Sequence, residues 1–157
     1  MDKKIIEKII EREDPLDPTV EYEQLFRTLF ENSDEAIFVM DPDAEGLILE
    51  VNQAAAEMHG YTVEELRKLR ASDVHPVEVQ EGAEETIKRA IEGEWIEAEH
   101  DHLRKDGSRF PVRFRLFSTY YLGRRVVVAF ARDISHERRA KEALVRCENE
   151  LESVIGI

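Results

Sequence analysis

The stretch RKDGSRFPVRFRLFSTY, residues 104–120, decides how this chain folds. Gly107 marks a hairpin turn within it, because glycine readily adopts the positive φ that such turns require. From residue 109 to residue 120, apolar residues largely alternate with charged or polar ones. This period of two predicts a β-strand with one face toward a core. A strand at 95–104 precedes the turn, so we expect the two strands to pair antiparallel.

Outward from this hairpin, β-branched and aromatic runs predict three more strands, at 36–40, 47–51 and 125–133. Apolar residues at helical spacing, together with capping residues, predict helices between and around the strands. These helices begin at Thr19, which we expect to be a cap, and continue at 53–59, 62–69, 79–91 and from 135 onward. Strands interrupted by a helical block indicate an α+β fold, an antiparallel sheet with helices on one face.

Composition excludes several classes of protein. The chain has 157 residues, which suggests one domain with extensions. Its net charge of −13 repels nucleic acid and anionic membranes, so we expect no nucleic-acid partner and no direct membrane contact. The single cysteine, Cys147, cannot form an internal disulfide, and no apolar run approaches the ~20 residues of a membrane span. These features predict a cytoplasmic location.

The chain divides into three predicted parts. Residues 1–18 are an N-terminal helix with an isoleucine stripe and a proline-containing linker, 19–134 the sheet domain, and 135–157 a C-terminal helix. Apolar residues of this last helix recur at spacings of four and three, which is the seam of a short coiled coil. We therefore expect a homodimer whose seam consists of Ala140, Leu144, Cys147, Leu151 and Val154.

Six short motifs, in order, resemble the PAS domain family over residues 22–138. They are the strand pair at 37–52, the N-x-A…G-Y segment at 52–61, the T-x-E-E-L helix start at 62–66, D-V-H-P at 73–76, the R-K-D-G-S hairpin at 104–112 and D-I-S-x-E-R at 133–138. The resemblance implies a five-stranded antiparallel sheet in the order 2-1-5-4-3. It also implies a sensory module that signals through its C-terminal helix to a histidine kinase or diguanylate cyclase.

Three residues are candidates for relaying such a signal. Asn52 ends a strand and begins a helix, so its side chain can hold that corner. Asp133, followed by Ile134, lies between the last strand and the C-terminal helix, where a carboxylate can cap the helix and accept hydrogen bonds from the domain. The alternative is that these residues serve only as turn and cap residues.

Some PAS-like domains bind a cofactor, and the chain offers little for one. A haem type would need a histidine on the helix at 79–91, which has none, and His75 lies before that helix. The photosensory flavin type needs a cysteine in the helical block, where Cys147 does not lie. A redox flavin type would use Trp95, but Trp95 is one residue out of step and His102 replaces an expected asparagine. We expect no cofactor, with a flavin as the alternative and haem disfavoured.

Nine residues are expected to point into the space between the sheet and the helices. They could line a small-ligand pocket or simply fill the core, and the scarcity of polar groups among them favours the core. The nine are Ile37, Val39, Met58, Leu66, Ile87, Trp95, Phe114, Leu116 and Val128.

Two further observations concern chemistry. His100 and His102 share a face of a predicted strand, as two metal ligands could, but no clustered partner supports them, so we expect no metal and solvent-facing side chains. His136 begins a stretch superficially like a kinase phosphoacceptor box, but the residues after it do not match. No nucleophile–base pair or phosphate loop is visible, so the sequence predicts no enzyme.

The sequence therefore leaves three hypotheses for function. The first is a homodimeric sensory module that relays a signal to an output domain such as a histidine kinase. The second is a sensor that binds a flavin or another small ligand. The third is a ligand-free dimerisation adaptor.

Overall fold

The computed structural model describes residues 17–156, and the chain divides into two compact units between Asn32 and Ser33. The predicted helix with the isoleucine stripe lies in residues 1–16, outside the described residues. The first unit contributes α2 (Pro18–Glu31). Its cap is Asp17, whose carboxylate accepts a hydrogen bond from the backbone N–H of Thr19 at 3.0 Å, so the prediction of Thr19 as the cap was wrong. Proline suits the first helical position because it has no N–H to satisfy there.

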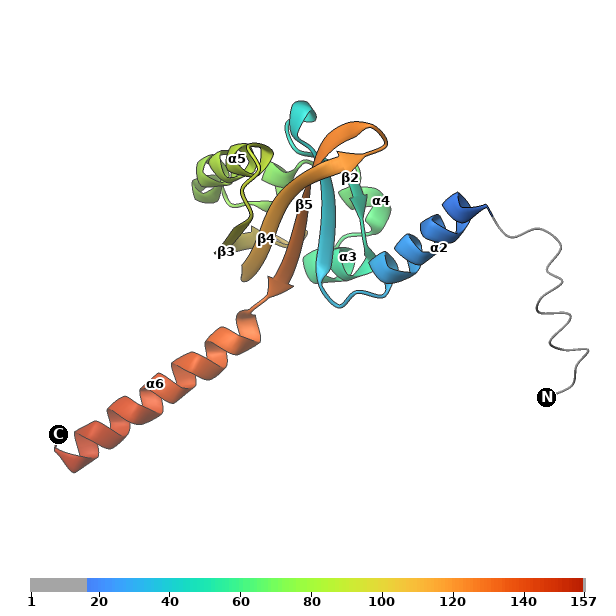
Figure 1. Ribbon diagram of the computed structural model, residues 1–157. Helices are drawn as coiled ribbons and strands as arrows, with labels where there is room; N and C mark the ends of the chain where they lie inside the picture. The colour runs from blue at the N-terminus through green and yellow to red at the C-terminus, as the bar shows by residue number, and fades with distance from the viewer. Residues whose placement is uncertain (1–16, 157) are drawn as a thin grey trace, which may run out of the picture. The chain divides into compact units, whose positions relative to one another are not determined.

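The second unit contains a five-stranded antiparallel sheet in the order β2-β1-β5-β4-β3, which confirms the predicted fold (Figure 1). Gly107 has φ +84° in the turn between β3 and β4, as the hairpin prediction required. The strands are β1 (Ala36–Asp41), β2 (Leu47–Val51), β3 (Ile96–Leu103), β4 (Arg109–Tyr121) and β5 (Arg124–Asp133).

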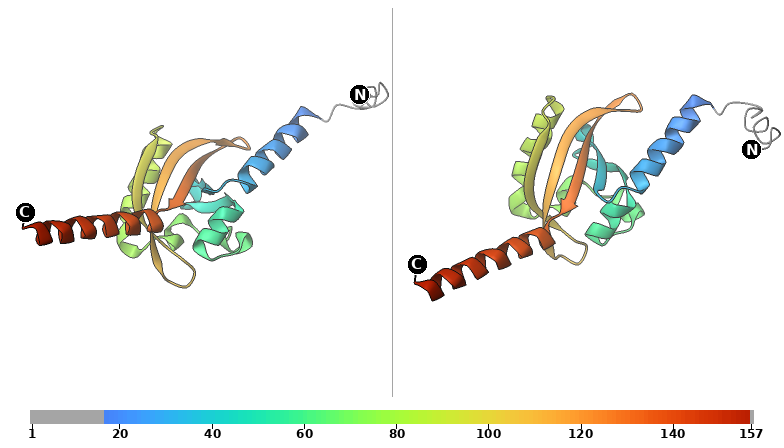
Figure 2. Two further views of the ribbon diagram at one scale, coloured as in Figure 1. Left: turned by 90° about the horizontal axis from the view of Figure 1, so that it is seen from below. Right: turned by 60° about the horizontal axis from the view of Figure 1, so that its bottom comes forward.

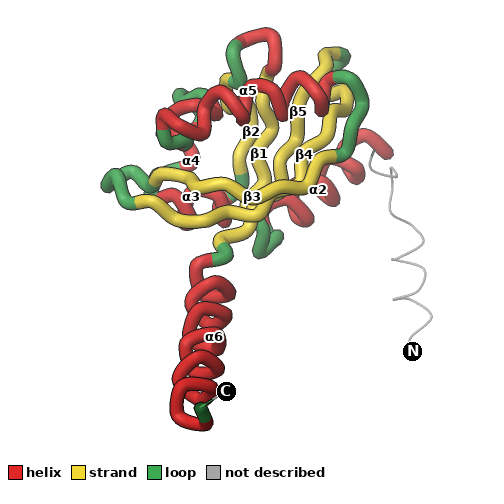
Figure 3. Tube along the Cα trace, turned by 90° about the vertical axis from the view of Figure 1, so that its left-hand side faces the viewer, coloured by secondary structure: helices red, strands yellow, loops and turns green. Residues whose placement is uncertain are grey.

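Helical segments fill the connection between β2 and β3 and pack on one face of the sheet (Figures 2 and 3). They are α3 (Gln53–His59), α4 (Val63–Leu66), η2 (Ala71–Val74) and α5 (Val77–Ile91), while η1 (Pro42–Ala44) joins β1 to β2 and α6 (Ser135–Ile155) follows β5. Because β3 ends the strand order, it is an edge strand and pairs only with β4. Among the described residues, no helix is long and apolar enough to cross a membrane.

The core forms between this helical block and the inner face of the sheet. Phe110, Val112, Phe114 and Leu116 of β4 point into it at every second position, as the alternation predicted. The intervening Arg113 and its neighbours face the other side of the sheet. Burying a large apolar side chain contributes about 1.5–3 kcal/mol, so this row holds the helical block on the sheet.

Asn52 ties the start of β1 to the start of α3. Its fully buried side-chain oxygen accepts hydrogen bonds from the backbone N–H groups of Ile37, at 2.9 Å, and Ala55, at 3.1 Å. Its amide nitrogen donates to the carbonyl of Glu35 at 2.9 Å. The side chain therefore caps the helix and holds the strand-to-helix corner in place.

Replacing this side chain should destabilise the fold strongly. We expect Asn52→Ala to lower the free energy of unfolding by about 3 kcal/mol, because it leaves buried backbone groups without partners. Thr62→Ala is the matched control, since it removes the exposed cap of α4 and should cost about 1 kcal/mol. Urea unfolding measures both values, and equal losses in the two variants would contradict the assignment.

Candidate ligand cavity and signalling junction

A small cavity lies between the helical block and the inner face of the sheet. Its volume is about 50 Å³. Carbon side chains from β1, β2, η2, α5, β4 and β5 form most of the wall. The polar side chains in it are Thr86 of α5 and three histidines, His75, His100 and His102. The cavity wall is therefore mainly apolar, with the imidazole rings of the three histidines on one side.

The structure brings together only some of the nine residues expected around this space. Ile87, Phe114 and Leu116 line the cavity. Leu66 and Met58 pack in the surrounding core without lining it.

Three other members of the set face the opposite side of the sheet, so their assignment to the pocket was wrong. Ile37 and Val39 alternate along β1 with Phe38 and Met40, which point into the core, and Val39 pairs with Val128 of β5. All six residues of β1 are buried. The sequence therefore shows no apolar–polar alternation there from which the inner face could be read.

The prediction that Trp95 points into the space between the sheet and the helices was also wrong. Its side chain is 78 % exposed and its ring stacks on Phe117 with 4.4 Å between ring centroids. The reason is the register of β3, which begins at Ile96 and turns that residue, not Trp95, into the core.

The prediction that His100 and His102 of β3 face solvent was also wrong. His102 is buried and His100 half-buried, and both line the cavity instead of facing solvent. His75, from the loop between η2 and α5, meets them there. The ring centroid of His75 lies 4.8 Å from that of His100 and 5.0 Å from that of His102. The clustered partner that the sequence did not reveal thus comes from a segment 25 residues earlier in the chain than His100.

A fourth histidine extends the cluster into the core. The Nδ1 of His59 lies 2.9 Å from the carbonyl oxygen of Ala55, and its Nε2 lies 2.8 Å from the Nδ1 of His102. A carbonyl can only accept, so the Nδ1 of His59 donates to it and a neutral His59 accepts from His102. The Nε2 of His102 then carries a lone pair and accepts from the Nε2 of His100 at 3.1 Å. The hydrogen bonds therefore run in one direction from the cavity to Ala55.

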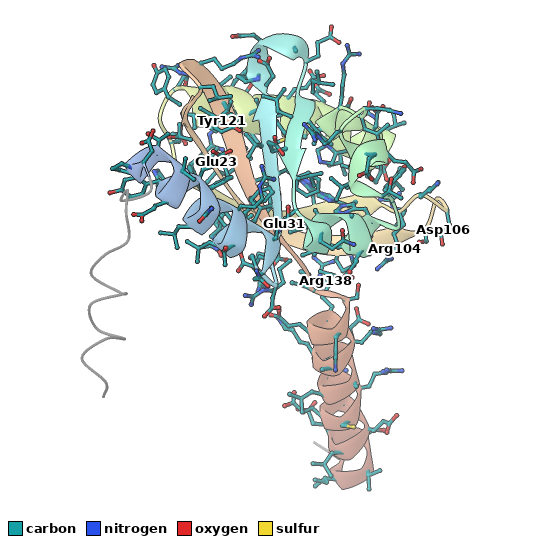
Figure 4. All side chains as sticks on the ribbon, turned by 90° about the vertical axis from the view of Figure 1, so that its right-hand side faces the viewer. Glu23, Glu31, Arg104, Asp106, Tyr121 and Arg138 are labelled. Carbon is teal, nitrogen blue, oxygen red and sulfur yellow. The ribbon has the colours of Figure 1, made fainter. Side chains whose placement is uncertain are left out.

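The hairpin end of β3 and β4, which also carries His102, connects to α6. One carboxylate oxygen of Asp133 accepts a hydrogen bond from the backbone N–H of Ser135 at 2.8 Å, and the other accepts from Arg104 at 3.0 Å. The backbone N–H of the buried Ile134 donates to the carbonyl of Pro111 at 3.0 Å. Asp133 and Ile134 thus bind the beginning of α6 to the β3–β4 hairpin, near the labelled Arg104 and Arg138 of Figure 4.

A second set of ion pairs, which the sequence reading missed, joins β3 directly to α6. Glu99 of β3 accepts hydrogen bonds from Arg113 of β4 at 2.9 Å and from Arg138 of α6 at 3.1 Å. Arg113 also donates to Glu137 of α6 at 3.0 Å. Single exposed ion pairs contribute at most about 1 kcal/mol, but a network fixes the relative geometry of the groups that it joins. The first turn of α6 is therefore held by two strands.

A match to a family model decides the family of this chain. A family model described as a PAS domain matches residues 34–136. The chain belongs to the PAS domain family. That match covers the sheet, the helical block, the cavity histidines and the first residues of α6.

Two curated relatives are similar to this chain over most of its length. The chain is 26 % identical over 149 residues to the methyl sulfide methyltransferase-associated sensor of Methanosarcina acetivorans, covering 94 % of this chain and 15 % of the relative. It is 29 % identical over 141 residues to the sensor histidine kinase TmoS of Ectopseudomonas mendocina, covering 85 % and 14 %. The chain thus spans about 15 % of the length of these relatives.

Solved structures agree on the fold. The PAS domain of an HTR-like protein from Haloarcula marismortui aligns with a TM-score of 0.65 and 27 % identity, over 74 % of this chain and 95 % of that one. A domain of a sensory box sensor histidine kinase/response regulator from Geobacter sulfurreducens aligns with a TM-score of 0.63 and 26 % identity, over 73 % and 96 %. PAS domains like this one therefore occur in sensor histidine kinases, and they are sensory, not catalytic.

Helix α6 of this PAS domain leaves the sheet at the end of β5 and carries the predicted seam (Figures 1 and 2). None of its residues is buried. The seam residues are all exposed, and they are Ala140, Leu144, Cys147, Leu151 and Val154. His136 is exposed on the first turn of the same helix, as expected.

Burial keeps the cavity histidines neutral at pH 7. Loss of solvent, assisted by the neighbouring His100 and His59, lowers the pKa of His75 to about 3. Burial likewise lowers the pKa of His100 to about 4 and that of His102 well below its ordinary value. A neutral imidazole has a free nitrogen lone pair, the form that binds metals and accepts hydrogen bonds. Among the described residues, these three histidines form the cluster whose ring nitrogens could jointly bind one metal ion.

The lowered pKa of His75 predicts a pH-dependent stability. Below pH 6.5 the unfolded chain binds a proton at His75 that the folded chain binds only near pH 3, so stability falls as the pH falls through this window. Removing the group with His75→Gln should make the slope shallower by up to about 1.4 kcal/mol per pH unit.

Urea unfolding between pH 7 and about pH 4.5, in a buffer with a chelator, measures this slope. His136→Gln, whose parent side chain is exposed on α6, is the control and should keep the wild-type slope. An unchanged slope in His75→Gln would show that His75 is not held neutral in the folded protein.

Proposed function

We propose that this PAS domain senses a small ligand in its cavity and relays the change through β3 to α6 and to an output such as a histidine kinase or diguanylate cyclase. One observation carries the proposal. On β3, His100 points into the cavity, and its neighbour Glu99 holds Arg138 of α6 on the outside of the sheet. A displacement of this strand therefore acts on the cavity and on the helix together.

The position of β3 at the edge of the sheet lowers the free-energy cost of such a displacement. It is an edge strand with hydrogen bonds to β4 alone, so it can shift without breaking a second ladder. A guest that contacts His100 or His102 would push or pull this strand. Glu99 would pass the movement to Arg138, and Arg113 would pass it to Glu137. Asp133 and Ile134 supply the fixed point about which α6 could turn.

The relatives support the kind of output. One is named a sensor and the other a sensor histidine kinase, and this chain corresponds to a small part of each. The output domain in our proposal is therefore taken by analogy from what those proteins are named.

The size of the cavity favours a small guest. One water needs roughly 10–15 Å³, so a cavity of about 50 Å³ holds a molecule of only a few atoms. A flavin would require the helical block to move away from the sheet. The three histidines on the cavity wall argue against a ligand-free dimerisation adaptor. Such an adaptor does not require polar side chains around an internal cavity.

Dimerisation through α6 is part of the proposal, since an isolated helix with an exposed apolar seam gains stability by pairing. We expect the chain to form a dimer that Leu144→Glu together with Leu151→Glu converts to a monomer. Val145→Glu is the matched control, because Val145 is exposed on α6 but lies outside the seam. Light scattering at several protein concentrations distinguishes the states, and a dimer that survives the seam variant would refute this part of the proposal.

The relay can be tested in a fusion of the full chain, through α6 in heptad register, to the dimerisation and catalytic domains of a histidine kinase. Glu99→Gln should change the rate of autophosphorylation by about two- to thirty-fold, because it releases Arg138 from β3. Arg89→Gln is the control, since it removes an equally exposed ion pair, with Glu94, at the end of α5. Equal rates in the wild type and Glu99→Gln would contradict the relay.

A further inference from the structure

We propose that His75, His100 and His102 form a binding site for a divalent transition metal at the wall of the PAS cavity. Each of these histidines has one ring nitrogen that could bind a metal, and the three nitrogens all lie within 4.8 Å of one another. Imidazole nitrogens suit zinc, copper, iron and nickel. The site depends on the cavity side chains alone and stands whether or not α6 relays a signal.

The spacing is close to that of a bound metal. Three nitrogens at tetrahedral positions, each about 2.0–2.1 Å from zinc, lie about 3.3 Å from one another. The Nε2 atoms of His100 and His102 are already 3.1 Å apart, and metal binding would move the proton of His100 from its Nε2 to its Nδ1. The widest separation in the set must shrink by roughly 1.5 Å, which rotation of the imidazole ring of His75 can supply.

The side chain of His75 is available for this role. It contacts the rings of His100 and His102, but its ring nitrogens have no hydrogen-bond partner among residues 17–156. No fully buried side-chain nitrogen of the described residues lacks a partner, so these ring nitrogens keep some access to solvent, from which a metal ion could reach them.

His102 is oriented by a residue behind it, as metal ligands usually are. Its Nδ1–H donates to His59, which donates in turn to the carbonyl of Ala55. This chain fixes the tautomer of His102 and leaves its Nε2 lone pair directed toward His100. Metal-binding histidines almost always use their second nitrogen in this way.

The remaining coordination position would open into the cavity. No carboxylate is among the side chains that line it, so three neutral ligands would leave the positive charge of the metal uncompensated. A small anion or a water that can lose a proton is the guest that such a site prefers. The fourth ligand would be held between β3, which carries two of the histidines, and Ile87 of α5.

The test uses the full chain after treatment with a chelator. Titration with Co²⁺, whose visible spectrum reports four-coordinate geometry, and with Zn²⁺ by calorimetry should show one strongly bound ion per chain. His75→Gln and His100→Gln should each weaken binding about tenfold or more. The chain has five histidines, and His136→Gln, the one substitution outside the cluster of four, should bind like the wild type.

Thermal unfolding supplies a second readout. At a free Zn²⁺ concentration of about 100 times Kd, Tm of the wild type and of His136→Gln should rise by roughly 5–10 °C. The substitution in His75→Gln lies in a loop and leaves the sheet intact, and Tm of this variant should rise by at most about half as much. The proposal is overturned if the wild type binds no Zn²⁺ with a fixed stoichiometry, if His75→Gln binds as tightly as the wild type, or if His136→Gln abolishes binding.

Discussion

The alternation of side chains along β3 is the constraint on which the rest depends. Successive residues of a strand point to opposite faces, so one short edge strand presents His100 and His102 to the cavity and Glu99 to the outside. The outer carboxylate holds Arg138 and Arg113, and through them the first turn of α6. The cavity and the helix therefore both contact β3, and in our proposal a displacement of this strand affects both.

The fold could be predicted almost completely, because its signals are local. The apolar row of β4, the hairpin turn at Gly107 and the cap at Asn52 each depend on neighbours in sequence and predict the elements, whereas the strand order 2-1-5-4-3 followed from the resemblance to the PAS domain family. The inner face of β1 could not be predicted, since both of its faces are apolar. Trp95 was misassigned for a related reason, because a shift of one residue in the start of β3 moves its side chain to the other face.

The site was harder to predict than the fold. His100 and His102 lie among glutamates and an aspartate, so β3 reads as a solvated strand on both faces. Their burial depends on α5 and on the loop of His75, a contact between segments that are distant in the chain. His59 is more distant still, and its position on the buried side of α3 gave only the helical period as a signal. Clusters of this kind become visible only when the elements are assembled.

Hydrogen exchange tests the central claim, the coupling of cavity and helix through β3, most directly. Amide exchange of the full chain would be followed by mass spectrometry with and without Zn²⁺, in the wild type and in Glu99→Gln. The account predicts that Zn²⁺ slows exchange in β3 and also changes it in the first turns of α6, and that the second effect disappears in Glu99→Gln. A change confined to the cavity walls in the wild type, with α6 unaffected, would contradict it.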